Sequence, residues 1–383
     1  RELLTSSGWE IWASVDTLLP SLVEAAPDDF LNILESKLRT DLATIEKLMT
    51  ENEEVITTNY YYNGLYWSLE LLSWNERYIV RVGAILATLS NIEKNNKSLD
   101  TISRILLPWY PQTLASIEKR KTTIEAVLNI NEDFGWSLLL AILPNKQTTS
   151  CSTYKPKWIN TVAEDTNENV TNKDYSQQVQ NYIDMLIKYC GTDTKRLTDL
   201  ISKLDDASKE NFDKIVETLS QKEIVRLSDD KKYILWDKLL DLISRHKNYA
   251  HTNWALPKGA INILEGVVDK IKPKSIGTVY RRLFRKDKWN LIDDRKDRKK
   301  SEEKLNNLQD QYIKEMFSMG KEDFLSFIKS VEDSHQAGVS LAEVINDKDV
   351  DEFVFNYLDS KDEKLLAFSK GYVWKKFKTT TLL

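Results

Sequence analysis

The side chains that most often hold metals are scarce in this chain. It contains three histidines (His246, His251, His335) and two cysteines (Cys151, Cys190) among 383 residues. A helical zinc site takes two histidines four positions apart with a carboxylate alongside, whereas His246 and His251 are separated by Lys-Asn-Tyr-Ala at a predicted helix end. The cysteines lack paired spacing, which favours a reducing compartment over a disulfide framework. We therefore predict no metal site.

Carboxylate pairs are the next candidates for chemistry, as general acids and bases. The acidic doublets are Asp28-Asp29, Asp205-Asp206, Asp229-Asp230 and Asp293-Asp294. The first three lie where helices are predicted to begin, and carboxylates are favoured there by main-chain N–H groups and the helix dipole. The sequence has no G-x-x-x-x-G-K-[ST], G-x-G-x-x-G or G-x-S-x-G pattern. We predict that this chain is no enzyme, with no catalytic residue and no cofactor of its own.

One basic cluster could bind an acidic partner. It consists of Arg281, Arg282, Arg285, Lys286 and Lys288, and more basic residues follow up to residue 300. The range 281–300 holds ten basic and four acidic residues. The cluster predicts an electrostatic patch for a protein partner; the alternative is a solvated helix start. Nucleic acid is the less favoured ligand because the net charge is −5 and the pI is near 5.6.

A second candidate contact is aromatic. Tyr60, Tyr61 and Tyr62 are consecutive, and Tyr66 and Trp67 follow closely. Three consecutive positions sweep about 200° of a helix circumference, so they cannot all face inward. We expect at least one ring to lie on the surface or between repeats. Core packing is the default for the others, and the alternative is a partner-binding anchor at Tyr60, Tyr61 and Tyr62.

The elements that must position these residues are helices. Apolar side chains recur with helical spacing, for example Phe30, Leu34 and Leu38, and the eleven glycines and eight prolines are few for this length. The chain also exceeds the limit of about 250–300 residues for a single core. We predict an all-α fold, a degenerate HEAT- or TPR-like α-solenoid of stacked helical hairpins, with a globular helix bundle as the alternative.

Composition predicts where the chain divides. Residues 145–174 hold only seven apolar residues in thirty, which predicts a polar loop or insertion, and Tyr154 and Trp158 are expected to pin it to the surface. We predict helical blocks at 1–144, 175–294 and 295–383. The longest apolar run, 136–143, is too short for a bilayer, so no membrane contact is predicted.

Several segments resemble the helical-repeat regions of large bacterial antiphage STAND NTPases of the AVAST type and related defence proteins. They occur in the same order and cover roughly residues 10–290. The matching segments are 22–31 (LVEAAPDDFL), 106–120 (LLPWYPQTLASIEKR), 135–144 (GWSLLLAILP), 154–158 (YKPKW), and 245–249 (RHKNY) leading to 254–257 (WALP). These segments are scaffold and carry no catalytic motif, so the resemblance transfers no site residue.

The resemblance implies a function. In that family an effector and a STAND ATPase precede C-terminal helical repeats, which bind a phage protein such as the terminase large subunit or the portal. This chain would then be the sensor of a cytoplasmic parent protein that self-associates and uses ATP and Mg²⁺ elsewhere. The start at Arg1, without an initiator methionine, also leads us to expect a piece of a longer protein. The alternative function is a protein-interaction or autoinhibitory α-solenoid scaffold of another multidomain bacterial protein.

Overall fold

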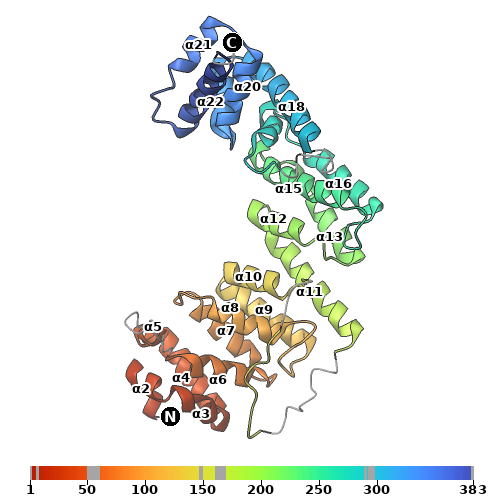
Figure 1. Cartoon of the computed structure of the whole chain (residues 1–383). Helices are drawn as coiled ribbons and strands as arrows, with labels where there is room; N and C mark the ends of the chain where they lie inside the picture. The colour runs from red at the N-terminus through yellow and green to blue at the C-terminus, as the bar shows by residue number, and fades with distance from the viewer. Residues whose placement is uncertain are drawn as a thin grey trace. The chain divides into compact units, whose positions relative to one another are not determined.

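The fold is entirely helical wherever the chain is described. The computed structural model describes residues 2–5, 8–49, 61–145, 150–159, 170–288, 291 and 298–380. Over these residues no strand occurs, which confirms the predicted all-α class (Figure 1). The chain divides into two compact units, Arg1–Tyr189 and Cys190–Leu383, called unit 1 and unit 2 below. The finer division into blocks stays a prediction.

Unit 1 is a succession of short helices that pack on their neighbours. In chain order they are α1 (Glu2–Thr5), α2 (Trp9–Ser14), η1 (Asp16–Leu18), α3 (Leu19–Ala25), α4 (Pro27–Thr40), α5 (Leu42–Met49), α6 (Asn63–Ser73), α7 (Ile79–Leu89), α8 (Lys97–Leu106), α9 (Ile117–Ile130), α10 (Glu132–Ile142) and α11 (Asn172–Cys190). Helix α6 packs on α8, α7 on α9, and α8 on α10. Contact with the helix two places along is typical of stacked repeats, so the packing is consistent with the predicted solenoid.

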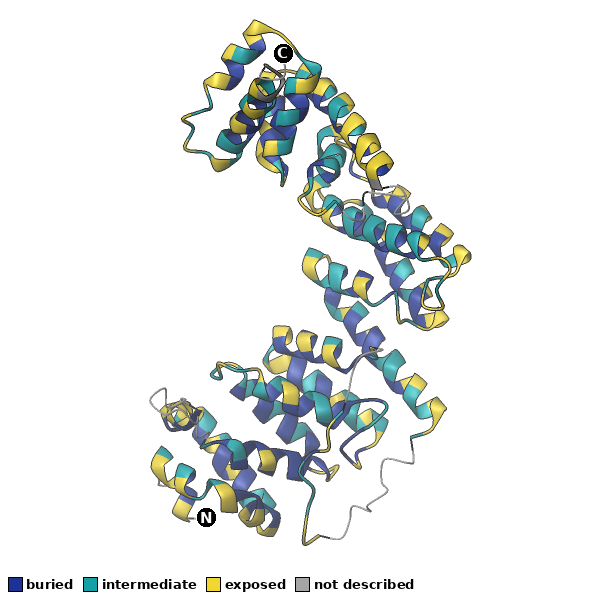
Figure 2. Ribbon diagram, in the orientation of Figure 1, coloured by how far each residue is buried: buried dark blue, intermediate teal, exposed yellow. Residues whose placement is uncertain are grey.

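Local sequence explains where these helices begin and which side they bury. Pro27 opens α4, as its fixed φ favours at a first helical position. The side chains of Ser116 and Asn131 cap α9 and α10 by accepting main-chain N–H groups of their first turns. The buried faces of these helices turn toward neighbouring helices (Figure 2). Leu86 and Leu138, for example, are fully buried.

Unit 2 continues in the same style with longer helices. They are α12 (Thr194–Ser202), α13 (Lys209–Leu219), α14 (Lys222–Val225), α15 (Asp229–Asn248), α16 (Lys258–Ile271), α17 (Ile276–Tyr280), η3 (Arg281–Phe284), α18 (Arg298–Ser318), α19 (Lys321–Ser330), α20 (Ser334–Val344), α21 (Lys348–Phe355) and α22 (Glu363–Thr380). Helices α12 and α16 pack on α15, and α18 and α22 pack on α20. Phe284 of η3 joins Phe324 and Phe368 in the core formed with these later helices.

The closest helix contact in unit 2 is made through two glycines. A Cβ atom at Gly338 of α20 would lie 2.0 Å from the carbonyl oxygen of Phe368, and one at Gly371 of α22 would lie 2.1 Å from that of His335. Main chain therefore touches main chain between α20 and α22. A larger residue would have to push the two helices apart, because backbone cannot move aside as a flexible side chain can.

The start of α15 is fixed by a carboxylate that reaches to another segment. Asp229 accepts the main-chain N–H groups of Lys274 (2.9 Å) and Ser275 (2.7 Å) and pairs with Lys232 at 2.9 Å. The hydrogen bond from Lys232, together with these N–H groups, lowers the pKa of Asp229 from 3.8 to about 2. The charged form of Asp229 is thus bound more strongly in the folded chain than in the unfolded one.

Replacing Gly338 with alanine should destabilise unit 2. The added methyl group collides with the backbone of α22, so we expect Gly338→Ala to lower the free energy of unfolding by about 3 kcal/mol. Gly266→Ala on α16 is the matched control: open space surrounds that position, and a helical Gly→Ala change stabilises by roughly 0.5–1 kcal/mol. Urea unfolding followed by circular dichroism measures both. Equal effects at the two positions would contradict the close contact.

The Asp229 contacts should make unit 2 sensitive to acid. A carboxylate whose pKa is lowered on folding stabilises fully above its ordinary pKa of 3.8, and this stabilisation is lost as the pH falls through about 2. Asp229→Asn should therefore lower the melting temperature at pH 7 and flatten its decline between about pH 4 and pH 2. Asp230→Asn, which leaves the Lys274 and Ser275 bonds in place, should leave the neutral-pH melting temperature nearly unchanged. An acid profile of Asp229→Asn parallel to that of the wild type would refute this role.

Candidate partner-binding surface

The predicted tyrosine patch lies largely in the interior of unit 1. Tyr60 falls outside the described residues, and Tyr61 is half-buried just before α6. Tyr62 is buried; its hydroxyl accepts an N–H of Asn95 at 2.7 Å, and its ring meets that of Tyr66 edge-on at 5.8 Å. Tyr62 thus packs and forms its hydrogen bond within unit 1. Of the two described tyrosines of the triplet, Tyr61 is the more exposed.

Two arginines of the predicted basic cluster are neutralised inside unit 2. Arg282 binds Asp237 and, at 2.8 Å, Asp241. Arg285 reaches the same two carboxylates at 3.1 and 2.9 Å. All four side chains are less than one-fifth exposed. Burial opposes the charge on Arg285, but Asp237 and Asp241 raise its pKa above the ordinary value. This four-charge network ties η3 to α15.

The remaining three basic residues lie further out. Arg281 pairs with Asp230 at 2.5 Å and stacks over the ring of Tyr233 at 4.6 Å. Lys288 lies 3.9 Å from Asp333, and the side chain of Lys286 is exposed. A role of this region in partner binding stays a prediction, and within it Lys286 and Lys288 are the more accessible charges.

Sequence inspection missed the counter-charges of this network. Asp237 and Asp241 are four apart and so share one face of α15, and Arg282 and Arg285 are three apart, within η3 and directly after it. That matched spacing is the signal that could have paired them. Composition alone could not show this pairing, because the two aspartates and the two arginines are more than forty residues apart in the chain.

A strongly exposed aromatic is Trp158, in the irregular segment 153–159, which we call the strap. Its side chain is 77% exposed. Tyr154 stacks on Trp67 with ring centroids 6.0 Å apart, which confirms that this ring pins the segment, whereas Trp158 does not. The expectation for Trp158 was wrong because the main chain, and not the indole, is the part that the protein holds.

The main chain around Trp158 is held by one buried carboxylate. Glu24 of α3 accepts the N–H groups of Lys157 (3.1 Å), Trp158 (2.6 Å) and Ile159 (2.8 Å). Glu24 itself is only 6% exposed. Buried carboxylates require such partners, and hydrogen bonds to a charged group are stronger than neutral ones. The indole of Trp158 is therefore displayed on a fixed backbone.

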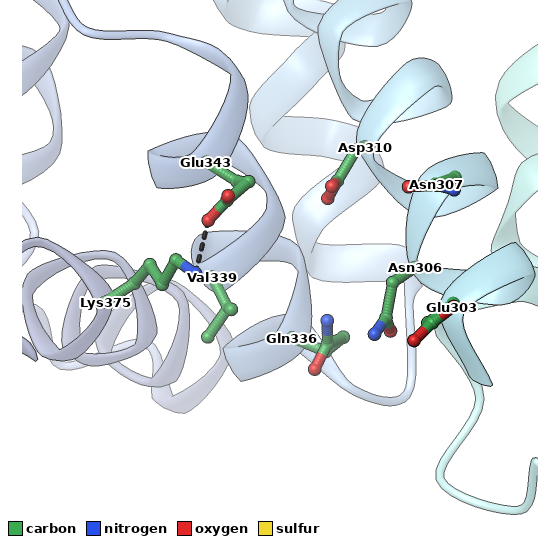
Figure 3. Close-up of a pocket in the computed structure, with 8 residues that line it drawn as sticks. All are labelled: Glu303, Asn306, Asn307, Asp310, Gln336, Val339, Glu343 and Lys375. Atoms are coloured by element: carbon green, nitrogen blue, oxygen red, sulfur yellow. Dashed lines mark ion pairs between the residues drawn. The ribbon is translucent and has the colours of Figure 1, made fainter. Parts of the chain in front are cut away.

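Unit 2 contains a polar pocket between α18, α20 and α22 (Figure 3). Its volume is about 440 Å³, and it is lined by Glu303, Asn306, Asn307, Asp310, Gln336, Val339, Glu343 and Lys375. Lys375 pairs with Glu343 across it. Burial raises the pKa of Asp310. The lining offers carboxylate and amide oxygens to a hydrogen-bond donor but places no nucleophile beside a base.

His246 is hydrogen-bonded at both ring nitrogens and has a structural role. Within a buried site His246 donates from Nε2 to Asp205 (2.8 Å) and accepts at Nδ1 the N–H of Leu256 (3.0 Å). Both ring nitrogens are thus occupied. Among the described residues no group of three or more His, Cys, Asp or Glu side chains is arranged to hold a metal ion.

Two further findings concern the chain as a whole. No helix in the described ranges is both long and apolar enough to cross a membrane. Neither any protein-family model nor any curated protein matches the chain.

Replacing a basic residue of the cluster with glutamate should destabilise the chain at a buried position and have little effect at an exposed one. Arg282→Glu places a third carboxylate beside Asp237 and Asp241, so we expect the free energy of unfolding to fall by about 3–5 kcal/mol. Lys286→Glu, at an exposed position of the same cluster, should change it by less than about 0.5 kcal/mol. Chemical denaturation of both variants tests this. A stable Arg282→Glu variant would show that the buried network is dispensable.

Proposed function

We propose that this chain is the ligand-sensing helical module of a bacterial antiphage STAND NTPase and binds a phage protein of the terminase or portal type. The scaffold segments that resemble that family, and occur in the same order, support the proposal, and so does the all-α fold. The observation that carries it is Trp158, which is 77% exposed on a main chain held by Glu24 and lies inside one of the resembling segments.

An exposed tryptophan on a fixed main chain is suited to anchor a protein partner. Tryptophan is enriched among the residues that dominate binding energy at interfaces. The three N–H bonds to Glu24 order the main chain before binding, so less conformational entropy is lost when the partner docks. Trp67, 38% exposed and stacked on Tyr154, adds a second aromatic on the same unit.

In this proposal the chain acts by binding and leaves catalysis to the rest of the parent protein, where ATP and Mg²⁺ would bind. The parent would work in the cytoplasm, and ligand binding would shift it toward a self-associating state. A shift from 1:99 to 99:1 takes about 5.5 kcal/mol of differential binding. An interface of standard size provides that amount.

Co-expression with phage proteins tests the proposal. The chain should co-purify with a terminase large subunit or a portal protein, and Trp158→Ala should weaken that complex by about 2 kcal/mol, or roughly thirtyfold in Kd. Phe377→Ala is the matched control, because Phe377 is a comparably exposed ring (68%) in unit 2. Titration calorimetry of the purified complex gives the affinities.

Two outcomes would count against it. Binding to none of the phage proteins would favour the alternative of an interaction or autoinhibitory scaffold with another partner. A loss at Phe377→Ala with none at Trp158→Ala would remove Trp158 from the binding surface.

A further inference from the structure

The surface of unit 1 beneath the strap, called the face below, holds the strap through side chains that accept main-chain N–H groups. Glu70 of α6, 4% exposed, accepts the N–H of Tyr154 at 2.8 Å, and Gln112 accepts that of Thr153 at 3.3 Å. With Glu24, three side chains of unit 1 thus bind five main-chain N–H groups of the strap. Recognition through main-chain hydrogen bonds is largely independent of the bound sequence.

Two side-chain contacts add selectivity. The indole N–H of Trp74 donates to the hydroxyl of Thr153 at 3.1 Å. The ring of Tyr154 lies on the indole of Trp67, with an angle of 18° between the ring planes. The face therefore selects a hydroxyl residue followed by an aromatic one, ahead of a stretch with free N–H groups.

The face is held in place by contacts that do not involve the strap. Arg104 pairs with Glu70 at 2.9 Å, and the N–H of Gln112 donates to the carbonyl of Ile105 at 3.1 Å. The loop that carries Gln112 is joined to the end of α6 by the N–H of Leu114, which donates to the carbonyl of Trp74 at 3.2 Å. Trp67 and Glu70 lie on α6, against which α3 packs. The binding groups thus have supports other than the segment they bind.

We infer that this face of unit 1 is a binding site for an irregular, non-helical peptide segment of a partner protein, and that residues 153–159 occupy it as an intramolecular ligand. The strap is covalently tethered, so its effective concentration is on the order of millimolar. A partner segment must outcompete it, and the strap thereby sets a threshold for binding. The proposed function uses the seated strap, whereas this inference concerns a partner segment that displaces it, so the two are independent of each other.

The test uses the full chain and a fluorescent synthetic peptide of residues 150–159 with serine at Cys151. The release variant carries Thr153→Ala and Tyr154→Ala, which remove the strap's contacts with Trp74 and Trp67 through these two side chains and leave the face itself unchanged. We expect the release variant to bind the peptide at least about tenfold more tightly than the wild type, measured by fluorescence anisotropy, because the tethered competitor is weakened. No binding by a release variant with unchanged circular dichroism would overturn the inference.

N-methylated peptides provide the matched control for main-chain recognition. N-methylation at Trp158 blocks the N–H that lies closest to Glu24 and should weaken binding about tenfold. N-methylation at Lys155, whose N–H bonds to neither Glu24 nor Glu70, should have little effect. Equal losses at the two positions would contradict recognition by Glu24.

Hydrogen exchange of the wild-type chain keeps the inference testable if the release variant does not fold. Excess peptide should displace the strap and accelerate exchange of the amides of Trp158 and Ile159. Unchanged exchange at saturating peptide would overturn the inference. Unlabelled wild-type chain should displace labelled peptide poorly from the release variant. Displacement as strong as that by free peptide would instead identify the occupant as the strap of a second copy and overturn the assignment to a partner protein.

Discussion

Carboxylates that reach across helices to hydrogen-bond donors fix irregular segments in both units, and the two buried ones, Glu24 and Glu70, must find such donors. Glu24 and Glu70 hold the strap on unit 1. In unit 2, Asp229 holds residues 274 and 275 against the start of α15, and Asp237 with Asp241 holds η3. Apolar helix packing alone is tolerant of small sliding and rotation. The carboxylates reach across helices to specific donors and so set which segment lies where.

The regular part of this structure could be predicted from sequence, because it follows from local rules. Helical spacing of apolar residues and the scarcity of glycine and proline indicated the all-α class, and the start of α4 at Pro27 follows the local preference of proline for a first helical position. These signals lie within a few residues of the feature they specify. Tyr154 was likewise expected to pin the polar segment, because aromatic rings are rare in this stretch and pack on apolar surface.

The long-range polar contacts could not be predicted in the same way. Arg282 and Arg285 form part of a basic run in sequence, and only the fold brings Asp237 and Asp241 to them. Tyr62 belongs to an aromatic run, and only the fold supplies Asn95. Trp158 resembled an anchor to the protein's own surface because sequence shows side chains, whereas its main chain makes the contacts with Glu24. In each case the missing information was a partner located far along the chain.

Anchoring of the strap through its main chain has a consequence for how the sequence of unit 1 can change in evolution. Glu24 binds N–H groups, which every residue except proline provides, so these three hydrogen bonds do not require particular side chains at 157, 158 and 159. Substitutions there can alter the displayed surface at little cost to folding. A protein under pressure to follow a changing ligand could therefore vary Trp158 and Ile159 among residues other than proline, while Glu24 and the helix that carries it stay the same.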